Sequence, residues 1–166
     1  MNKDYTRLPR NYTLMCDAYE FAMSDAYIRS GIANDEAVFD LFFRKVPNGG
    51  GYVIMAGLDK VIEYMENLTF SDKELDYFRK NGYSPEFIEY LENFKFSGDI
   101  YAIPDGTPVY PNEPLITVKA PIIEAQIIET ALLAIINGAT EHATAARRII
   151  EATPENVAVM EFGARR

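Results

Sequence analysis

The chain has 166 residues, a formal net charge of −9, 48% hydrophobic residues and 25% charged residues. This length predicts one domain with a core of ordinary size, and the composition is typical of a soluble globular protein. The acidic balance argues against sequence-independent binding of nucleic acid, which requires a basic surface. We expect no membrane-spanning run, and the N-terminal stretch does not have the pattern of a signal peptide.

Cys16 and His142 are the single cysteine and the single histidine of the chain. One cysteine excludes an internal disulfide and fits a reducing, cytoplasmic environment, where we expect Cys16 to be a packed core thiol. One histidine excludes a multi-histidine metal site. We therefore predict no metal site on this chain.

The first predicted elements are a helix over residues 13–29 and a strand over residues 37–45. Small and apolar residues recur in the helix at three- and four-residue spacing, namely Leu14, Ala18, Phe21, Ala22 and Ala26. Gly31 ends the helix. The strand is rich in β-branched and aromatic residues, and the loop "NGGGY" after it can pass close to another backbone or a ligand.

Helical segments follow in the middle of the chain. We predict one helix over residues 52–68. "SDKE", from Ser71 to Glu74, has the pattern of a capping box that begins a short helix. Another helix is predicted to begin after Ser84, with Pro85 at its first position.

The last third of the chain changes character. Residues 98–121 are rich in proline and turn residues, which predicts two or three short strands. A long apolar helix is predicted over residues 122–152, and a buried strand over residues 157–162. The order is mixed α+β, followed by a helix-to-strand step that is typical of the start of a parallel α/β unit.

Four stretches of the sequence occur in an order that carries a family resemblance. They are "CDAYEFAM" (16–23), "AVFDLFFRKVPNGGGYVIMAGLDKVIEYMENLTFS" (37–71), "EYLENFKFSGDIYAIPDGTPVYPNEPLITVKAPIIEAQIIET" (89–130) and "EFGARR" (161–166). Together they resemble nicotinate phosphoribosyltransferases. The resemblance covers nearly all of residues 12–166, and the ordered set is far more specific than any single piece.

The resemblance implies an α+β fold, the N-terminal α/β domain of a type II phosphoribosyltransferase. Mixed helices and short antiparallel strands would form a hammerhead-like arrangement over residues 1–120. A long connecting helix would occupy residues 121–156. Residues 157–166 would then be the first strand and loop of a (β/α) barrel that is otherwise missing, so we expect the N-terminal portion of a longer enzyme.

The function that the resemblance implies is the synthesis of nicotinate mononucleotide from nicotinate and phosphoribosyl pyrophosphate, coupled to ATP hydrolysis, in cytoplasmic NAD biosynthesis. The complete enzyme would be a homodimer with shared sites and would use Mg²⁺ and ATP, neither bound by this chain alone. The family's phosphorylated histidine lies beyond the start of the barrel. We therefore predict no catalytic residue in this chain, and a structural or surface role for His142.

The resemblance also nominates substrate-binding residues. Tyr19 matches the tyrosine that stacks on the nicotinate ring in a site shared with the partner subunit, and Asp17 is expected to orient its helix. Arg165 and Arg166 would bind a carboxylate or phosphate, because a guanidinium holds either in bidentate fashion. Arg44 and Lys45, before the glycine loop, would support the same anion site.

Three alternatives remain open at this point. The chain could be a non-catalytic split subunit or interaction domain that completes a partner's barrel. It could be a carrier domain of the biotinyl or lipoyl type, although the hairpin tips "PDGT" and "PNEP" contain no lysine to modify. The related enzyme could also act on quinolinate or nicotinamide, which share the fold plan.

Overall fold

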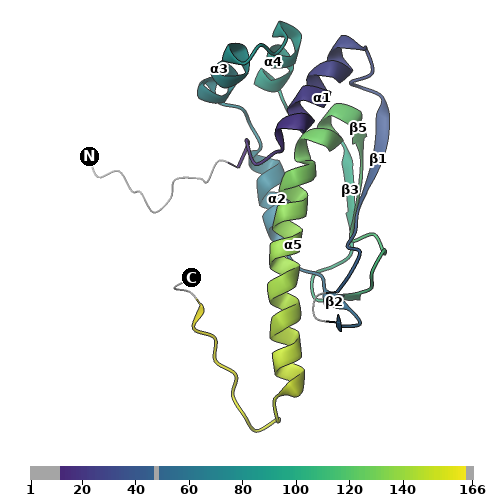
Figure 1. Cartoon of the computed structure of the whole chain (residues 1–166), viewed down its shortest axis with the longest axis vertical. Coiled ribbons are helices and arrows are strands. Elements are labelled where there is room, and N and C mark those ends of the chain that lie inside the picture. Colours follow the sequence, from purple (N-terminus) through teal and green to yellow (C-terminus); the bar gives the residue numbers. More distant parts are fainter. Residues whose placement is uncertain (1–11, 47–48, 164–166) are drawn as a thin grey trace, which may run out of the picture.

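The structure is a computed structural model and describes residues 12–46 and 49–163. The described part alternates helices with short strands (Figure 1). The elements in chain order are α1 (Ala18–Arg29), β1 (Glu36–Leu41), β2 (Val53–Ile54), α2 (Leu58–Asn67), α3 (Asp72–Lys80), α4 (Pro85–Glu92), β3 (Asp99–Ala102), β4 (Pro108–Val109), β5 (Ile116–Pro121) and α5 (Ile122–Ala152).

The strands form two small antiparallel sheets. In the larger sheet β5 lies between β1 and β3, with Val38 opposite Lys119 and Ile100 opposite Val118. The smaller sheet pairs β2 with β4. Alternate residues of β5 are buried, so one face of the larger sheet faces the core. The two or three short strands expected in residues 98–121 are confirmed, as β3, β4 and β5.

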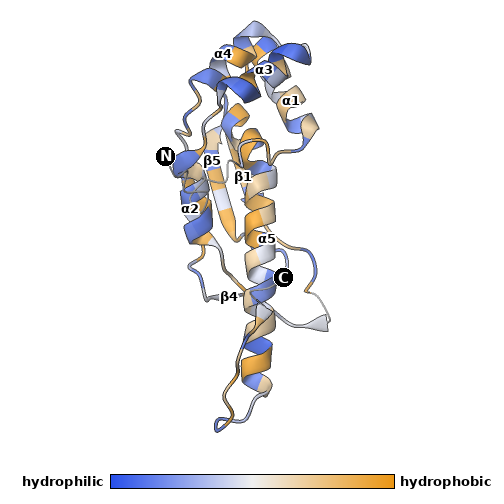
Figure 2. Cartoon of the chain, turned by 90° about the vertical axis from the view of Figure 1, so that its left-hand side faces the viewer, coloured by the Kyte–Doolittle hydropathy of each residue, from blue (hydrophilic) through white to orange (hydrophobic). Residues whose placement is uncertain are grey.

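Helix α5 is the longest element and runs along both sheets (Figure 1). Its first half supplies much of the core, including the fully buried Ile123, Ile127 and Ile128. By length and composition alone α5 could cross a membrane, which corrects the expectation that no run could. Half of its most apolar window is buried inside the fold, as in the core helix of a soluble protein. Figure 2 shows this apolar character along β5 and the upper part of α5.

A second part of the core lies where α3 and α4 pack against α1. Five phenylalanine rings meet there edge to face, namely Phe21, Phe70, Phe78, Phe87 and Phe94. Both predicted helix starts are confirmed. The Ser71–Glu74 capping box is present, and the Ser84 hydroxyl accepts a hydrogen bond from the Phe87 amide at 3.2 Å.

The predicted helix over residues 13–29 is wrong at its start and confirmed at its end, Arg29. The observed helix begins at Ala18, after a turn that is anchored by a hydrogen bond from the Thr13 hydroxyl to the Thr69 carbonyl. Ala18, Ala22 and Ala26 are exposed. The buried face instead carries Glu20, Phe21, Ser24 and Asp25. Hydrogen-bond partners on α4 and α5 stabilise the buried carboxylates of Glu20 and Asp25, and a local pattern cannot reveal these partners.

The predicted helix over residues 52–68 is wrong in its first third, and the predicted strand over residues 37–45 ends earlier, at Leu41. Residues 53–54 are the strand β2, and α2 begins after Gly57, whose backbone has φ +113°. The Gly57 and Leu58 amides both donate to the Asp105 carboxylate, so a residue from the β3–β4 connection caps α2.

The predicted buried strand over residues 157–162 is not observed. Val157, Val159, Met160 and Phe162 are exposed, and the segment turns back at the lower end of α5 without pairing (Figure 1). A buried strand needs a neighbouring strand, and this segment pairs with none of the strands that the structure describes. The parallel α/β unit expected there is therefore absent from the described part of the chain.

Candidate functional site

Tyr19 lies on the first turn of α1, where this helix packs against α5. Its side chain is 50% exposed, and its hydroxyl donates a long hydrogen bond of 3.4 Å to Glu129 of α5. Partial desolvation, followed by the negative charges of Glu129, Glu20 and Asp17, raises the pKa of Tyr19. The phenol therefore stays neutral at physiological pH, and an aromatic surface is left accessible beside α5.

A chain of hydrogen bonds continues from Glu129 along the contact between α1 and α5. The second carboxylate oxygen of Glu129 accepts from the Gln126 side chain at 2.8 Å. The Gln126 amide oxygen accepts from the Tyr27 hydroxyl at 3.2 Å. Gln126 is buried. Glu129 and Tyr27 are therefore both hydrogen-bonded to a side chain that is held in the core.

Glu20, the neighbour of Tyr19, is fully buried in the same contact. Its carboxylate accepts hydrogen bonds of 2.6 Å from the Thr130 hydroxyl and from the Cys16 thiol. The Thr130 oxygen in turn accepts from the Asp17 amide at 3.3 Å. Burial raises the pKa of Glu20 even though both hydrogen bonds act to lower it.

Cys16 is half-buried and packs against the core. Burial, and then the hydrogen bond to Glu20, raises the pKa of its thiol far above the ordinary value. Since the thiolate is the reactive form of cysteine, Cys16 is an inert structural thiol, as the sequence predicted. Asp17 is the N-cap residue of α1, but its side chain makes no capping hydrogen bond, so its expected role of orienting that helix stays a prediction.

A groove of about 650 Å³ lies between β1, β5 and α5, and it is lined in part by Glu129, the hydrogen-bond partner of Tyr19. Phe39, Val118 and Ile128 form part of its apolar wall, while Arg44 and Glu129 supply opposite charges. The fold thus brings Arg44 close to the residue that holds Tyr19, although the two are far apart in the sequence. Lys45 is exposed and does not line this groove.

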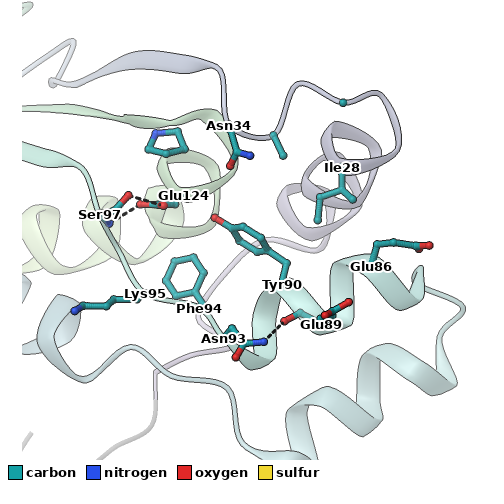
Figure 3. Close-up of a pocket in the computed structure, with 13 residues that line it drawn as sticks. Ile28, Asn34, Glu86, Glu89, Tyr90, Asn93, Phe94, Lys95, Ser97 and Glu124 are labelled. Carbon is teal, nitrogen blue, oxygen red and sulfur yellow. Dashed lines mark hydrogen bonds between the residues drawn. The ribbon is translucent and has the colours of Figure 1, made fainter.

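A second groove, of about 670 Å³, lies between α4, the loop after α1 and the first turn of α5 (Figure 3). At its floor Glu124 accepts hydrogen bonds from the Ser97 amide at 2.7 Å and the Ser97 hydroxyl at 2.9 Å. Figure 3 shows the Tyr90 side chain between Glu124 and α4; burial, and then the charge of Glu124, raises the pKa of Tyr90. No predicted site residue lies here, and Glu124 joins the loop at Ser97 to the start of α5.

The remaining predicted residues do not join these grooves. His142 is exposed, and its Nδ1 lies 2.6 Å from the Gly138 carbonyl oxygen of its own helix, in agreement with a structural or surface role. Arg165 and Arg166 lie outside the described residues, so their predicted anion binding stays a prediction. Within residues 12–46 and 49–163, no three histidine, cysteine or acidic side chains come together as possible metal ligands. The expected use of Mg²⁺ by the complete enzyme stays a prediction.

Comparison with protein-family models matches residues 14–137 to the nicotinate phosphoribosyltransferase N-terminal domain. The chain belongs to this family. It is 46% identical over 155 residues to nicotinate phosphoribosyltransferase of Bacillus subtilis, covering 93% of this chain and 31% of the relative. It is 42% identical over 154 residues to nicotinate phosphoribosyltransferase pncB2 of Mycobacterium tuberculosis, covering 92% and 33%. The chain therefore spans about a third of the length of the curated relatives that it matches.

Solved structures agree with the assignment to this nicotinate phosphoribosyltransferase family. The crystal structure of human nicotinic acid phosphoribosyltransferase superposes with a TM-score of 0.80 at 31% identity, covering 90% of this chain and 31% of the human one. Nicotinate-nucleotide pyrophosphorylase from Pyrococcus furiosus superposes with a TM-score of 0.63 at 21% identity, which shows a shared fold only. The expected mixture of helices and short antiparallel strands is thus confirmed. The missing barrel and the division at residues 120 and 156 stay predictions.

The family match includes residues 98–121, the hairpin-rich stretch that suggested a carrier domain. The "PDGT" turn is packed against α2, because its Asp105 carboxylate accepts hydrogen bonds from the amides at the start of that helix. A carrier domain presents a modifiable lysine on an accessible turn. This turn has no lysine, and its acidic residue is used to cap a helix.

Proposed function

We propose that this chain is the N-terminal part of an enzyme that forms nicotinate mononucleotide from nicotinate and phosphoribosyl pyrophosphate in NAD biosynthesis. The relatives at 42–46% identity carry the name of this activity, which supports the proposal. They also favour the nicotinate branch over the quinolinate and nicotinamide branches. The proposal concerns the complete enzyme, because the chain matches only about a third of each relative.

The observation that carries the proposal is the setting of Tyr19. A half-exposed aromatic ring on the surface, tied by its hydroxyl to Glu129, suits offset stacking on a flat pyridine. Such stacking contributes about 0.5–1.5 kcal/mol beyond the burial of area. Arg44, in the groove beside Glu129, supplies positive charge for an anionic substrate, and Arg165 and Arg166 are proposed to bind a carboxylate or phosphate.

The residues described here provide binding rather than bond-making chemistry. The departure of pyrophosphate requires stabilisation of developing charge, and we propose that those groups lie on a barrel that completes the site. We propose that Mg²⁺ and ATP serve the complete enzyme and are held outside the described residues. We further propose that the enzyme is a cytoplasmic homodimer in which Tyr19 enters the partner's site.

A second candidate function is that of a non-catalytic subunit that completes a partner's barrel. The exposed apolar side chains of Val157, Val159, Met160 and Phe162 favour it, because such a segment gains stability when another surface covers it. Both proposals thus require a covering surface for residues 157–162. They differ in whether the barrel belongs to the same polypeptide.

Conversion of radiolabelled nicotinate tests these proposals. The complete enzyme should form nicotinate mononucleotide with phosphoribosyl pyrophosphate, faster with Mg²⁺ and ATP, whereas the 166-residue chain alone should be inactive. Activity that appears only when a separate barrel subunit is added would favour the split-subunit function. Absence of product from every combination, with quinolinate or nicotinamide converted instead, would reject the nicotinate assignment.

A further inference from the structure

Consecutive residues of α1 pair with consecutive residues of α5. Tyr19 bonds to Glu129, and Glu20 bonds to Thr130, although the members of each pair are 110 positions apart in the sequence. The two bonds lie side by side along the contact between the helices. A small rotation of α1 about its axis would lengthen both of them.

The Tyr19–Glu129 bond ends on a side chain that is itself held. One carboxylate oxygen of Glu129 accepts from Tyr19, and the other accepts from Gln126 at 2.8 Å. Gln126 is buried, and its amide oxygen is occupied by the Tyr27 hydroxyl. With both oxygens in use and its neighbour fixed, Glu129 has little freedom to follow a moving tyrosine.

The apolar packing of α1 does not by itself set this orientation. The side of α1 that carries Ala18, Ala22 and Ala26 is exposed, and on the buried side Phe21 is the one large apolar residue beside the polar Glu20, Ser24 and Asp25. Contacts between apolar surfaces are not directional and tolerate small rotations. Hydrogen bonds weaken steeply when they are misaligned, so they are suited to fix the rotation of a helix.

We infer that Glu129, held by Gln126, is a positioning residue that fixes the orientation of the Tyr19 ring for stacking on the pyridine substrate. This inference rests on the proposed function, in which Tyr19 contacts nicotinate. Glu129 acts through Tyr19 and touches no reacting atom. Its loss should therefore weaken the binding of nicotinate and leave the chemical step and the binding of phosphoribosyl pyrophosphate unchanged.

Steady-state kinetics of the full-length enzyme that contains this chain provide the first test. Tyr19→Phe keeps the ring and removes its hydroxyl, and Glu129→Ala removes the acceptor. Each should raise the KM for nicotinate about fivefold, as expected for the loss of one hydrogen bond. The double variant should be no worse than either single variant, because both changes remove the same contact. The values of kcat and of the KM for phosphoribosyl pyrophosphate should stay within about twofold.

Two further variants separate positioning from folding. Glu129→Gln retains one oxygen that can accept from Tyr19 but loses the second oxygen that accepts from Gln126, so its nicotinate KM should lie between those of wild type and Glu129→Ala. Glu141→Ala, an exposed change on the same helix, should leave every parameter unchanged. If Glu129→Gln is as impaired as Glu129→Ala, or if Glu129→Ala leaves the nicotinate KM unchanged, the inference is overturned.

A second readout does not depend on turnover. With 3-fluorotyrosine incorporated, the ¹⁹F signal of Tyr19, assigned by its absence in Tyr19→Phe, should be sharp in the wild-type enzyme. It should broaden or split in Glu129→Ala and recover in part in Glu129→Gln, which keeps the acceptor for Tyr19 but not the acceptor for Gln126. An unchanged signal in Glu129→Ala contradicts positioning even if the enzyme is active. A wild-type enzyme without nicotinate turnover rejects the proposed function, while the fluorine signal still decides whether Glu129 holds the ring.

Discussion

Replacement of Asp25 by asparagine tests how the buried polar face of α1 stabilises the fold. One Asp25 oxygen accepts from the Ser84 hydroxyl and, at 3.3 Å, from the Ser84 amide. The other accepts from the Arg29 guanidinium at 2.5 Å. Burial alone would raise the pKa of Asp25, but the hydrogen bonds from Ser84 and Arg29 outweigh it and lower the pKa. The charged form is therefore the one that joins α1 to the N-terminus of α4.

The expected loss in free energy of unfolding depends on which of these hydrogen bonds are buried. Hydrogen bonds to a charged group contribute about 1.5–3 kcal/mol each when buried, and neutral ones about 0.5–1.5 kcal/mol. The Arg29 guanidinium is largely exposed, so that pair contributes only about 0–1 kcal/mol. Asparagine still accepts from Ser84 but without the charge. We expect Asp25→Asn to lower the free energy of unfolding by about 1–2 kcal/mol, and Asp25→Ala by about 3 kcal/mol.

Urea unfolding followed by circular dichroism measures this loss. A matched control is Asp76→Asn, which makes the same chemical change in the exposed Asp76–Arg79 pair and should cost less than about 0.5 kcal/mol. Because the folded-state pKa of Asp25 lies below its ordinary value of 3.8, its contribution is present above that value and disappears as the pH falls through the folded-state pKa. A loss in Asp25→Asn no larger than in Asp76→Asn, or one independent of pH, would refute the reasoning.

Four other changes have defined outcomes. Tyr19→Ala should raise the KM of the complete enzyme for nicotinate at least tenfold, because the contact with the ring and its stacking are lost. The melting temperature should be unchanged, and a KM within twofold of wild type would contradict stacking. Arg165→Ala should abolish turnover without unfolding, as measured by activity and thermal melting. Gly57→Ala should destabilise the chain to urea by about 1–3 kcal/mol, because φ is +113° and the new Cβ would lie 2.9 Å from that of Ala139. Glu20→Gln should flatten the pH dependence of stability: the raised pKa of Glu20 means that its contribution is largest in acid and is lost as the pH rises through the folded-state pKa.

Local signals in the sequence were sufficient for several elements. The capping box at Ser71–Glu74 and the Ser84–Pro85 pair predicted the starts of α3 and α4, because the hydrogen bonds that begin a helix connect residues three apart. The apolar run after Pro121 predicted α5, and proline-rich turns predicted the short strands before it. The resemblance nominated Tyr19, and the structure brings Arg44 to the adjacent groove.

The structure differs from the local sequence pattern where a segment is held by residues that are distant in the sequence. Residues 52–57 have a helical pattern, but the pairing of β2 with β4 and the Asp105 cap move the start of α2 to Leu58. The β2 edge is held in addition by the Thr144 hydroxyl of α5, which accepts from the Ile54 amide at 2.9 Å. These contacts involve residues outside 52–68, so the pattern within this segment could not reveal them. The pattern by itself favoured one long helix.

By itself, the sequence determined most of the helices, the apolar character of α5 and the family, and it nominated Tyr19, because each depends on residues that are close neighbours or on an ordered set of motifs. The tertiary structure alone decided that α1 buries Glu20 and Asp25, and that the Tyr19 hydroxyl donates to Glu129, whose other oxygen accepts from Gln126. It also left residues 157–162 exposed where the sequence predicted a buried strand. The physical reason is that a polar side chain or a strand is stable in a buried position only when a partner is present, and the partner's position depends on how the whole chain folds.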